Sequence, residues 1–203
     1  IFQTAQEVSA SAQPFAKPGY FKYKDQNGDK LIDARDKVIL GNPNPKYTYG
    51  INMGMEYRNW DFQLDIQGVA GVDLYNATKG VRYGNENYTE DFYQNRWFGP
   101  GTSNTYPSAA LEGPNLDPNS WFVEKGDYIR IRNVQIGYTL KESVLKRWKL
   151  QKLRFFANAQ NPFTYFKYKG FTPEIGGAPM STGIDLNVYP LSATYNVGFN
   201  INF

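Results

Sequence analysis

The densest group of side chains with possible chemistry is an acidic segment that runs from Asp25 to Asp36. Oxygen-bearing side chains stand at positions 1, 3, 5, 9 and 12 of this segment, and the main-chain carbonyl of Leu31 is available at position 7. Ca²⁺ takes six to eight hard oxygen ligands, and a loop with this spacing wraps them around one point. The sequence therefore predicts a structural calcium ion with the ligands Asp25, Asn27, Asp29, Leu31, Asp33 and Asp36.

Two residues of this segment depart from a standard calcium loop. Lys30 stands where such a loop has glycine for a sharp turn, and Asp36 reaches less far than a terminal glutamate. A competing interpretation is an Asx-rich surface turn, in which Asp and Asn side chains accept hydrogen bonds from their own main chain. Under either interpretation the carboxylates share one small turn without a cleft, so the segment does not predict acid–base catalysis.

The composition of the 203 residues excludes several classes of function. Cys and His are both absent, which removes disulfides, Cys nucleophiles, His-based triads and the usual zinc sites. The net charge of +3 is small and spread along the chain, so nothing favours nucleic acid as a partner. An acid pair on a recognisable glycosidase scaffold is also missing. The sequence predicts a protein that is not an enzyme.

The elements that must position the acidic segment and the long loops are β-strands, because apolar and polar side chains alternate with a period of two. This alternation predicts an antiparallel hairpin whose two strands meet at Asn59. Ile129 and Ile131 stand on the opposite parity to Val134, which predicts a β-bulge near Asn133. The predicted strands cover residues 47–58, 60–67, 127–140, 153–161 and 191–203. A short helix capped by Thr4 is expected within residues 4–12.

The last predicted strand favours a membrane. Its apolar face, from Leu191 to Phe203, is matched by a polar face of Ser, Thr, Asn and Gly without any charge. Its length exceeds the five or six residues of a typical globular strand and reaches the roughly 9–11 residues that cross a bilayer. Short and long connections alternate, as in outer-membrane barrels. A soluble antiparallel sheet also alternates, and five strands cannot close in lipid, so the membrane interpretation requires a larger barrel.

Several short motifs, taken in order, resemble the C-terminal region of SusC/RagA-type TonB-linked outer-membrane proteins. They are Asp25–Asp29, Gly41–Pro45, Val134–Tyr138, Ala157–Phe163, Tyr168–Glu174 and Tyr189–Pro190. The resemblance covers essentially the whole chain. It implies an all-β fold. The strands would form an antiparallel transmembrane barrel of about 22 strands, and an N-terminal domain would plug this barrel. This chain would supply its last five strands within residues 47–203, after an extracellular loop region at 1–46. The absence of a start signal before Ile1 fits a C-terminal part of a longer protein.

The resemblance also implies a function and partners. Such proteins lie in the Gram-negative outer membrane and import oligosaccharides or peptides, driven by the TonB complex, beneath a SusD-like surface lipoprotein that acts as a lid. Energy coupling belongs to N-terminal segments outside this sequence. Tyr195, Phe199 and Phe203 resemble the terminal aromatic signal that the barrel-assembly machinery reads.

The expected substrate-binding residues are aromatic side chains of the long loop at 71–126, namely Trp97, Tyr106 and Trp121. Aromatic faces stack on sugar rings or pack against a lid protein, although such residues also hold long loops together. An interpretation from another class is a soluble, calcium-containing β-sandwich that binds carbohydrate. Partition into detergent separates these two interpretations, because a barrel segment stays with detergent.

Overall fold

The structure is a computed structural model that describes residues 1–80, 88–110, 113–177 and 181–203. The chain forms two compact units, each treated by itself below. The first unit joins Ile1–Leu40 to Ala77–Val123, and the second joins Gly41–Asn76 to Glu124–Phe203. The predicted domain boundary lies after residue 46. In the structure, residues 77–123 belong to the same unit as residues 1–40.

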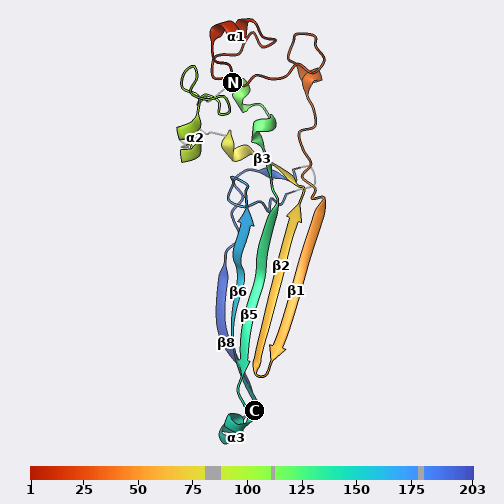
Figure 1. Cartoon of the computed structure of the whole chain (residues 1–203), viewed down its shortest axis with the longest axis vertical. Helices are drawn as coiled ribbons and strands as arrows, with labels where there is room; N and C mark the ends of the chain where they lie inside the picture. The colour runs from red at the N-terminus through yellow and green to blue at the C-terminus, as the bar shows by residue number, and fades with distance from the viewer. Residues whose placement is uncertain (81–87, 111–112, 178–180) are drawn as a thin grey trace. The chain divides into compact units, whose positions relative to one another are not determined.

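The second unit is built on one antiparallel sheet of long strands (Figure 1). The strand order is β1-β2-β5-β6-β8, and every neighbouring pair is antiparallel. The strands are β1 (Tyr47–Tyr57), β2 (Trp60–Ala70), β5 (Tyr128–Thr139), β6 (Lys152–Phe166) and β8 (Thr194–Asn202). This sheet confirms the predicted all-β, antiparallel fold and the hairpin at Asn59.

The predicted bulge is confirmed at Arg132. Asp65 of β2 pairs with Asn133, but its neighbour Ile66 pairs with Ile131, so Arg132 is the extra residue of β5. The bulge shifts the parity of the strand. As a result, Ile131 shares the apolar face of the sheet with Val134 although the two residues are three positions apart.

Three predicted strand boundaries were wrong: β2 runs to Ala70 and not to 67, and the end of β6 and the start of β8 also differ. The prediction ended the fourth strand at Asn161, but β6 continues to Phe166 because Asn161 and Pro162 form a bulge between the pairs Asn133↔Gln160 and Ile131↔Phe163. A proline is tolerated at a bulge, where its missing N–H leaves no ladder bond unmade. The final strand starts at Thr194 and not at 191, because its pairing with β6 ends where Thr194 meets Gln160.

Phe156, which breaks the alternation in β6, lies on the polar face between two glycines. It pairs with Gly137 on one side and with Gly198 on the other. A Cβ atom added to Gly198 would stand 2.8 Å from the Phe156 ring. The absent side chain of Gly198 therefore provides the space that the ring occupies.

A second, smaller set of strands caps one end of this unit. β4 (Val123–Lys125) and β7 (Ile184–Asp185) flank β3 (Asp73–Asn76), and β3 pairs with β7 in parallel. Val72, Leu74 and Tyr168 form its buried core. The Tyr168 hydroxyl donates to the fully buried Asp185 at 2.7 Å, and burial with this carboxylate raises the pKa of Tyr168 far above its usual range. The opposite end carries α3 (Glu142–Trp148).

The first unit consists of short helices and loops. They are α1 (Ala5–Ser9), η1 (Ala34–Asp36), η2 (Ala77–Lys79), α2 (Glu90–Asn95), η3 (Pro114–Leu116) and η4 (Ser120–Phe122). Phe2, Val8 and Tyr20 form a buried core. The predicted helix is confirmed, though shorter than expected: the Thr4 side chain accepts from the Glu7 N–H and caps α1. Among the described residues, no helix has the length and hydropathy needed to cross a bilayer.

Candidate functional site

One face of the five-stranded sheet is apolar and exposed. The exposed side chains come from both outer strands and include Tyr47, Ile51, Met53, Met55, Tyr57, Tyr195, Val197, Phe199 and Ile201. Val197, near the middle of β8, is 87% exposed. Soluble monomers rarely expose apolar patches of more than a few hundred Å². This face therefore requires an apolar neighbour outside the chain.

The opposite face carries a chain of hydrogen-bonded polar side chains that crosses four strands. Asn196 of β8 donates to Asn158 of β6 at 2.8 Å, and Asn158 donates to Asn133 of β5 at 2.6 Å. Asn133 and Gln63 both donate to the Asp65 carboxylate of β2 at 3.4 Å. We call this set the polar rung. The amide oxygens of Asn158 and Asn133 accept hydrogen bonds within the rung, and side chains of these types can also bind water or a polar solute.

Charged side chains on the polar face are paired with one another. Near the α3 end, the Arg154 guanidinium forms two hydrogen bonds with the Asp61 carboxylate, at 2.5 and 2.8 Å, above Gly137. Near the other end, the Arg130 Nη1 atom stands 2.5 Å from the Glu174 carboxylate. Arg130 is only 3% exposed. Glu174 lies in the segment that follows β6, so this ion pair holds that segment against the sheet.

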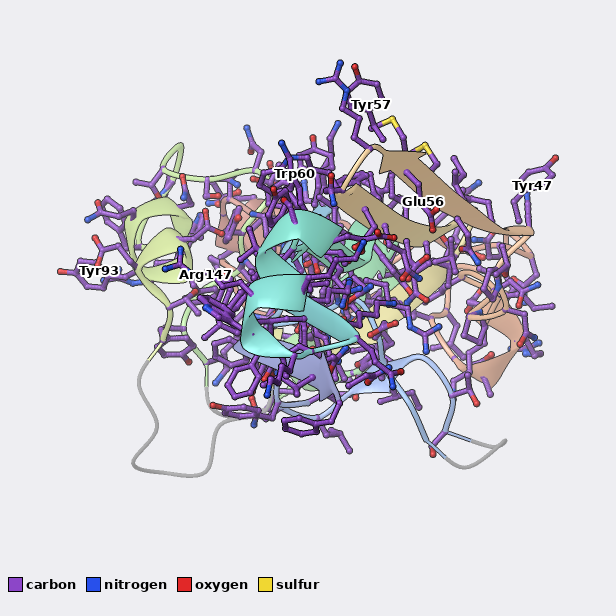
Figure 2. The ribbon with its side chains drawn as sticks, turned by 90° about the horizontal axis from the view of Figure 1, so that it is seen from below. Tyr47, Glu56, Tyr57, Trp60, Tyr93 and Arg147 are labelled. Atoms are coloured by element: carbon purple, nitrogen blue, oxygen red, sulfur yellow. The ribbon has the colours of Figure 1, made fainter. Side chains whose placement is uncertain are left out.

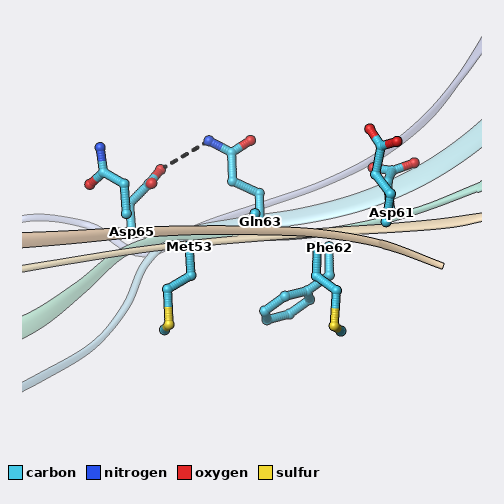
Figure 3. A pocket seen from close by; sticks show the side chains of 9 residues that line it. Met53, Asp61, Phe62, Gln63 and Asp65 are labelled. Carbon is cyan, nitrogen blue, oxygen red and sulfur yellow. Dashed lines mark hydrogen bonds between the residues drawn. The ribbon is translucent and has the colours of Figure 1, made fainter.

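A hollow of about 500 Å³ on β1 and β2 is open to its surroundings and is not an enclosed binding site. Its lining residues belong to β1 and β2, and Figure 3 shows Met53 and Phe62 on one side of the two strands. Asp61, Gln63 and Asp65 lie on the other side, with the Gln63–Asp65 hydrogen bond drawn between them. The site is therefore the polar surface of the sheet as a whole.

The structure brings together two of the three aromatic residues predicted to bind substrate. The rings of Tyr106 and Trp121 meet edge to face at 5.8 Å, and Phe92, which the sequence interpretation missed, contacts both. The Lys79 ammonium stands 4.5 Å from the Trp121 ring centre. These contacts are typical of a loop interior and support the competing, structural interpretation for Trp121.

Trp97 has different partners in the same unit. Its indole N–H donates to the Gln3 side chain at 3.1 Å, and its ring packs against Gly19, where a Cβ atom would stand 2.6 Å from it. Trp97 therefore joins the N-terminal segment to the long loop. Binding of substrate by Trp97, Tyr106 or Trp121 stays a prediction.

The acidic segment folds as a series of Asx turns. The two carboxylate oxygens of Asp25 accept from the N–H groups of Gly28, at 2.6 Å, and Lys30, at 2.8 Å. Asn27 accepts from the Asp29 N–H at 2.9 Å. Lys30 has a φ of 63°, so it adopts the left-handed conformation that glycine usually supplies in such loops. The departure at Lys30 does not prevent the turn.

The Arg35 guanidinium lies between the side chains of Asp29 and Asp33, two of the predicted calcium ligands. Its Nη2 atom stands 2.7 Å from carboxylate oxygens of both Asp29 and Asp33, and the hydrogen bonds from Arg35 lower the pKa of Asp33. The N–H groups of Asp33 and Gln26 donate to Asp36 and lower its pKa. In the described parts of the chain, no three acidic side chains converge on a point that could hold a metal ion. The calcium site stays a prediction, and Ca²⁺ would have to displace Arg35.

Replacing Arg35 with glutamine should raise the affinity of the segment for Ca²⁺ by about tenfold, because ligand charge sets the affinity of such loops. Titration calorimetry on the complete protein would measure this change. Lys37→Gln, two residues away, removes the same charge without touching Asp29 or Asp33 and serves as the control. If the unchanged protein and both variants show no heat of Ca²⁺ binding, the calcium prediction is contradicted.

The chain is similar to TonB-dependent receptors over nearly all of its length. It is 30% identical to TonB-dependent receptor P3 of Formosa agariphila, over 97% of this chain and 20% of that receptor. It is 28% identical to TonB-dependent receptor SusC of Bacteroides thetaiotaomicron, over 92% of this chain and 18% of that receptor. No family model matches the chain.

The chain belongs to the SusC/RagA type of TonB-dependent receptors. It spans about a fifth of the length of the curated receptors it matches. Its fold matches that in the structure of the RagAB peptide importer in the open-open state, with a TM-score of 0.69 and 23% identity over 89% of this chain and 20% of that chain. The relatives are named as receptors and importers and not as enzymes.

The last strand of this SusC/RagA-type chain presents the predicted assembly signal. Tyr195, Phe199 and Phe203 are 71%, 63% and 83% exposed, and the first two lie on the apolar face of β8. Within the described residues, β6 is the one strand paired with β8. Exposed aromatic side chains on an edge strand are accessible to a folding factor. Recognition of these residues by the assembly machinery stays a prediction.

Proposed function

We propose that this chain forms five neighbouring strands in the wall of an outer-membrane barrel. The apolar face then contacts lipid, and the polar rung faces the water-filled interior. The observation that carries this proposal is the contrast between the two faces: large apolar side chains are exposed on one, while the other has hydrogen-bonded amides and paired charges. The alternation of such faces is the signature of a transmembrane barrel strand.

The edges of the sheet support a larger barrel. In the part of the chain that the structure describes, β1 pairs with β2 alone and β8 with β6 alone. An unpaired main-chain N–H or C=O group costs several kcal/mol in hydrocarbon. Further strands must therefore continue the wall beyond β1 and β8, in agreement with a barrel of about 22 strands.

For the complete receptor, we propose import of oligosaccharides or peptides together with a SusD-like lipoprotein, driven by the TonB complex. The support is the membership in the receptor family and the fold shared with a peptide importer. The polar rung suits either substrate, because neutral amides can both donate to and accept from sugar hydroxyls or peptide groups. The alternative β-sandwich requires a second sheet over the apolar face, but Ile51 and Val197 remain exposed.

The test is uptake by cells that carry the complete receptor, compared with cells that lack its gene. We expect cells with the receptor to accumulate labelled oligosaccharides or labelled peptides, and a protonophore to abolish this uptake. Asn158→Trp should lower the rate more than Ala157→Trp, because Asn158 faces the polar side of the sheet and Ala157 the apolar side. Equal accumulation with and without the gene would contradict the proposed function.

A further inference from the structure

The connection between β5 and β6 carries a dense positive charge. Residues 141–152 contain five basic side chains and one acidic side chain, Glu142. The connection folds as α3 and lies at the end of the sheet where the β1–β2 hairpin turns (Figure 1). A bare turn would suffice to join two antiparallel strands, so the helix and its charge require another explanation.

The sheet holds α3 in place. Leu145 of α3 and Leu153 of β6 are 4% and 6% exposed, and α3 contacts β6. The Gln151 N–H, just after the helix, donates to the Asn202 carbonyl of β8 at 2.9 Å. The basic side chains are therefore presented at a fixed level relative to the strands.

Most of these charges have no acidic partner within the described residues. Lys146 pairs with Glu142 at 3.6 Å, and both side chains are at least 80% exposed, so the pair contributes little to stability. Arg147 and Lys149 are exposed and form no ion pair with any residue that the structure describes. Basic residues in a last helical turn favour the helix dipole, and Lys146 and Arg147 lie in the last turn of α3, whereas Lys149 follows it.

Exposed aromatic rings accompany the charges. Trp148 is 57% exposed on α3, and Tyr57 and Trp60 of the hairpin are 62% and 52% exposed. Arg58 lies 5.2 Å from the Tyr57 ring centre. Figure 2 looks onto this end and shows Arg147, Tyr57 and Trp60 from the two connections. Exposed aromatic rings beside basic side chains are the combination found where a protein meets the headgroup layer of a bilayer.

We propose that this turn-end collar, defined as Arg58, Trp60, Arg147, Trp148 and Lys149, binds the headgroups of anionic phospholipids. This inference rests on the proposed position of the sheet in a barrel wall. The phosphodiester of each lipid carries the charge opposite to that of the collar, and the rings of Trp60 and Trp148 enter the adjoining interfacial layer. The collar thereby fixes the depth of the wall in the leaflet that its turns face.

The test compares lipid retention by the complete receptor in native mass spectrometry after exchange into micelles that contain phosphatidylglycerol or phosphatidylcholine. We expect retention of phosphatidylglycerol over phosphatidylcholine. The double variant R147Q/K149Q should bind phosphatidylglycerol roughly 25-fold more weakly, since each basic residue near an anionic surface contributes on the order of a fivefold change. K17Q/K24Q, which removes two exposed charges of the first unit, is the matched control and should retain the lipid.

Equal retention of phosphatidylglycerol by R147Q/K149Q and by the unchanged receptor would overturn the proposal, as would equal retention of the two lipids. Displacement of the lipid by free glycerol phosphate would also overturn it, because the collar would then be a site for soluble phosphate. Failure of the proposed function would give a different result from failure of this inference, because the receptor would then be missing from the outer membrane. A receptor that is inserted and imports substrate, yet shows no preference between the lipids, would contradict this inference alone.

Discussion

Replacing Val197 with arginine should destabilise the folded receptor in a bilayer by about 2–4 kcal/mol. Val197 lies near the middle of β8 and is 87% exposed on the apolar face. A guanidinium at this position must leave water for hydrocarbon, and the cost is largest near mid-depth. Denaturant unfolding of the receptor from lipid vesicles, followed to equilibrium, would measure the change in free energy.

The neighbouring position supplies the control. Asn196 faces the polar side, and Asn196→Arg loses one hydrogen bond, to Asn158, at a cost of about 1 kcal/mol. The same new charge then projects into water. If the two variants lose the same free energy of unfolding, the two faces of β8 do not meet different solvents, and the barrel-wall assignment is wrong.

Truncating Glu174 to alanine should cost about 3 kcal/mol or more, because it leaves the buried Arg130 without its carboxylate. Glu174 accepts from Arg130 at 2.5 Å and from the Tyr128 hydroxyl at 2.7 Å. The loss should also release the segment after β6, where hydrogen exchange would increase. Equilibrium unfolding gives the free energy, and exchange gives its location.

Two further variants separate the ion pair from a general effect of truncation. Glu142→Ala removes a glutamate whose only ion pair in the described chain is exposed, and it should change the stability by no more than about 0.5 kcal/mol. Arg130→Met combined with Glu174→Ala should recover much of the loss, since apolar replacement of a buried ion pair is often neutral. A Glu174→Ala variant as stable as Glu142→Ala would show that the pair does not hold the segment.

The long strands could be predicted from the sequence because a sheet between two different surroundings imposes a period of two on its residues. The same rule predicted a bulge near Asn133, since a change of parity has no other simple cause, and the structure has it at Arg132. It failed at Pro162, which was interpreted as the start of a loop although a bulge admits proline within β6. Local pattern therefore predicts where a strand exists more reliably than where it ends.

Contacts between distant segments could not be predicted in this way. Arg130 and Glu174 are 44 positions apart, and Tyr168 and Asp185 are 17 apart. No periodicity links such residues, and each alone resembles an ordinary surface side chain. The aromatic residues of the long loop show the same limit: composition singled out Trp121, but only the fold shows that Phe92 and Tyr106 surround it. In the acidic segment, spacing could not reveal that Arg35 reaches Asp29 and Asp33.

The most direct test of the central claim is a cysteine scan along β8 in a receptor cleared of other cysteines, of which the 203 residues of this chain contain none. Single substitutions at 195–202 would be exposed to a water-soluble, membrane-impermeant maleimide in receptor reconstituted into bilayers. The account predicts labelling at positions 196, 198, 200 and 202 and protection at 195, 197, 199 and 201. Labelling of the odd positions as fast as the even ones would show that the apolar face meets water and would contradict the account.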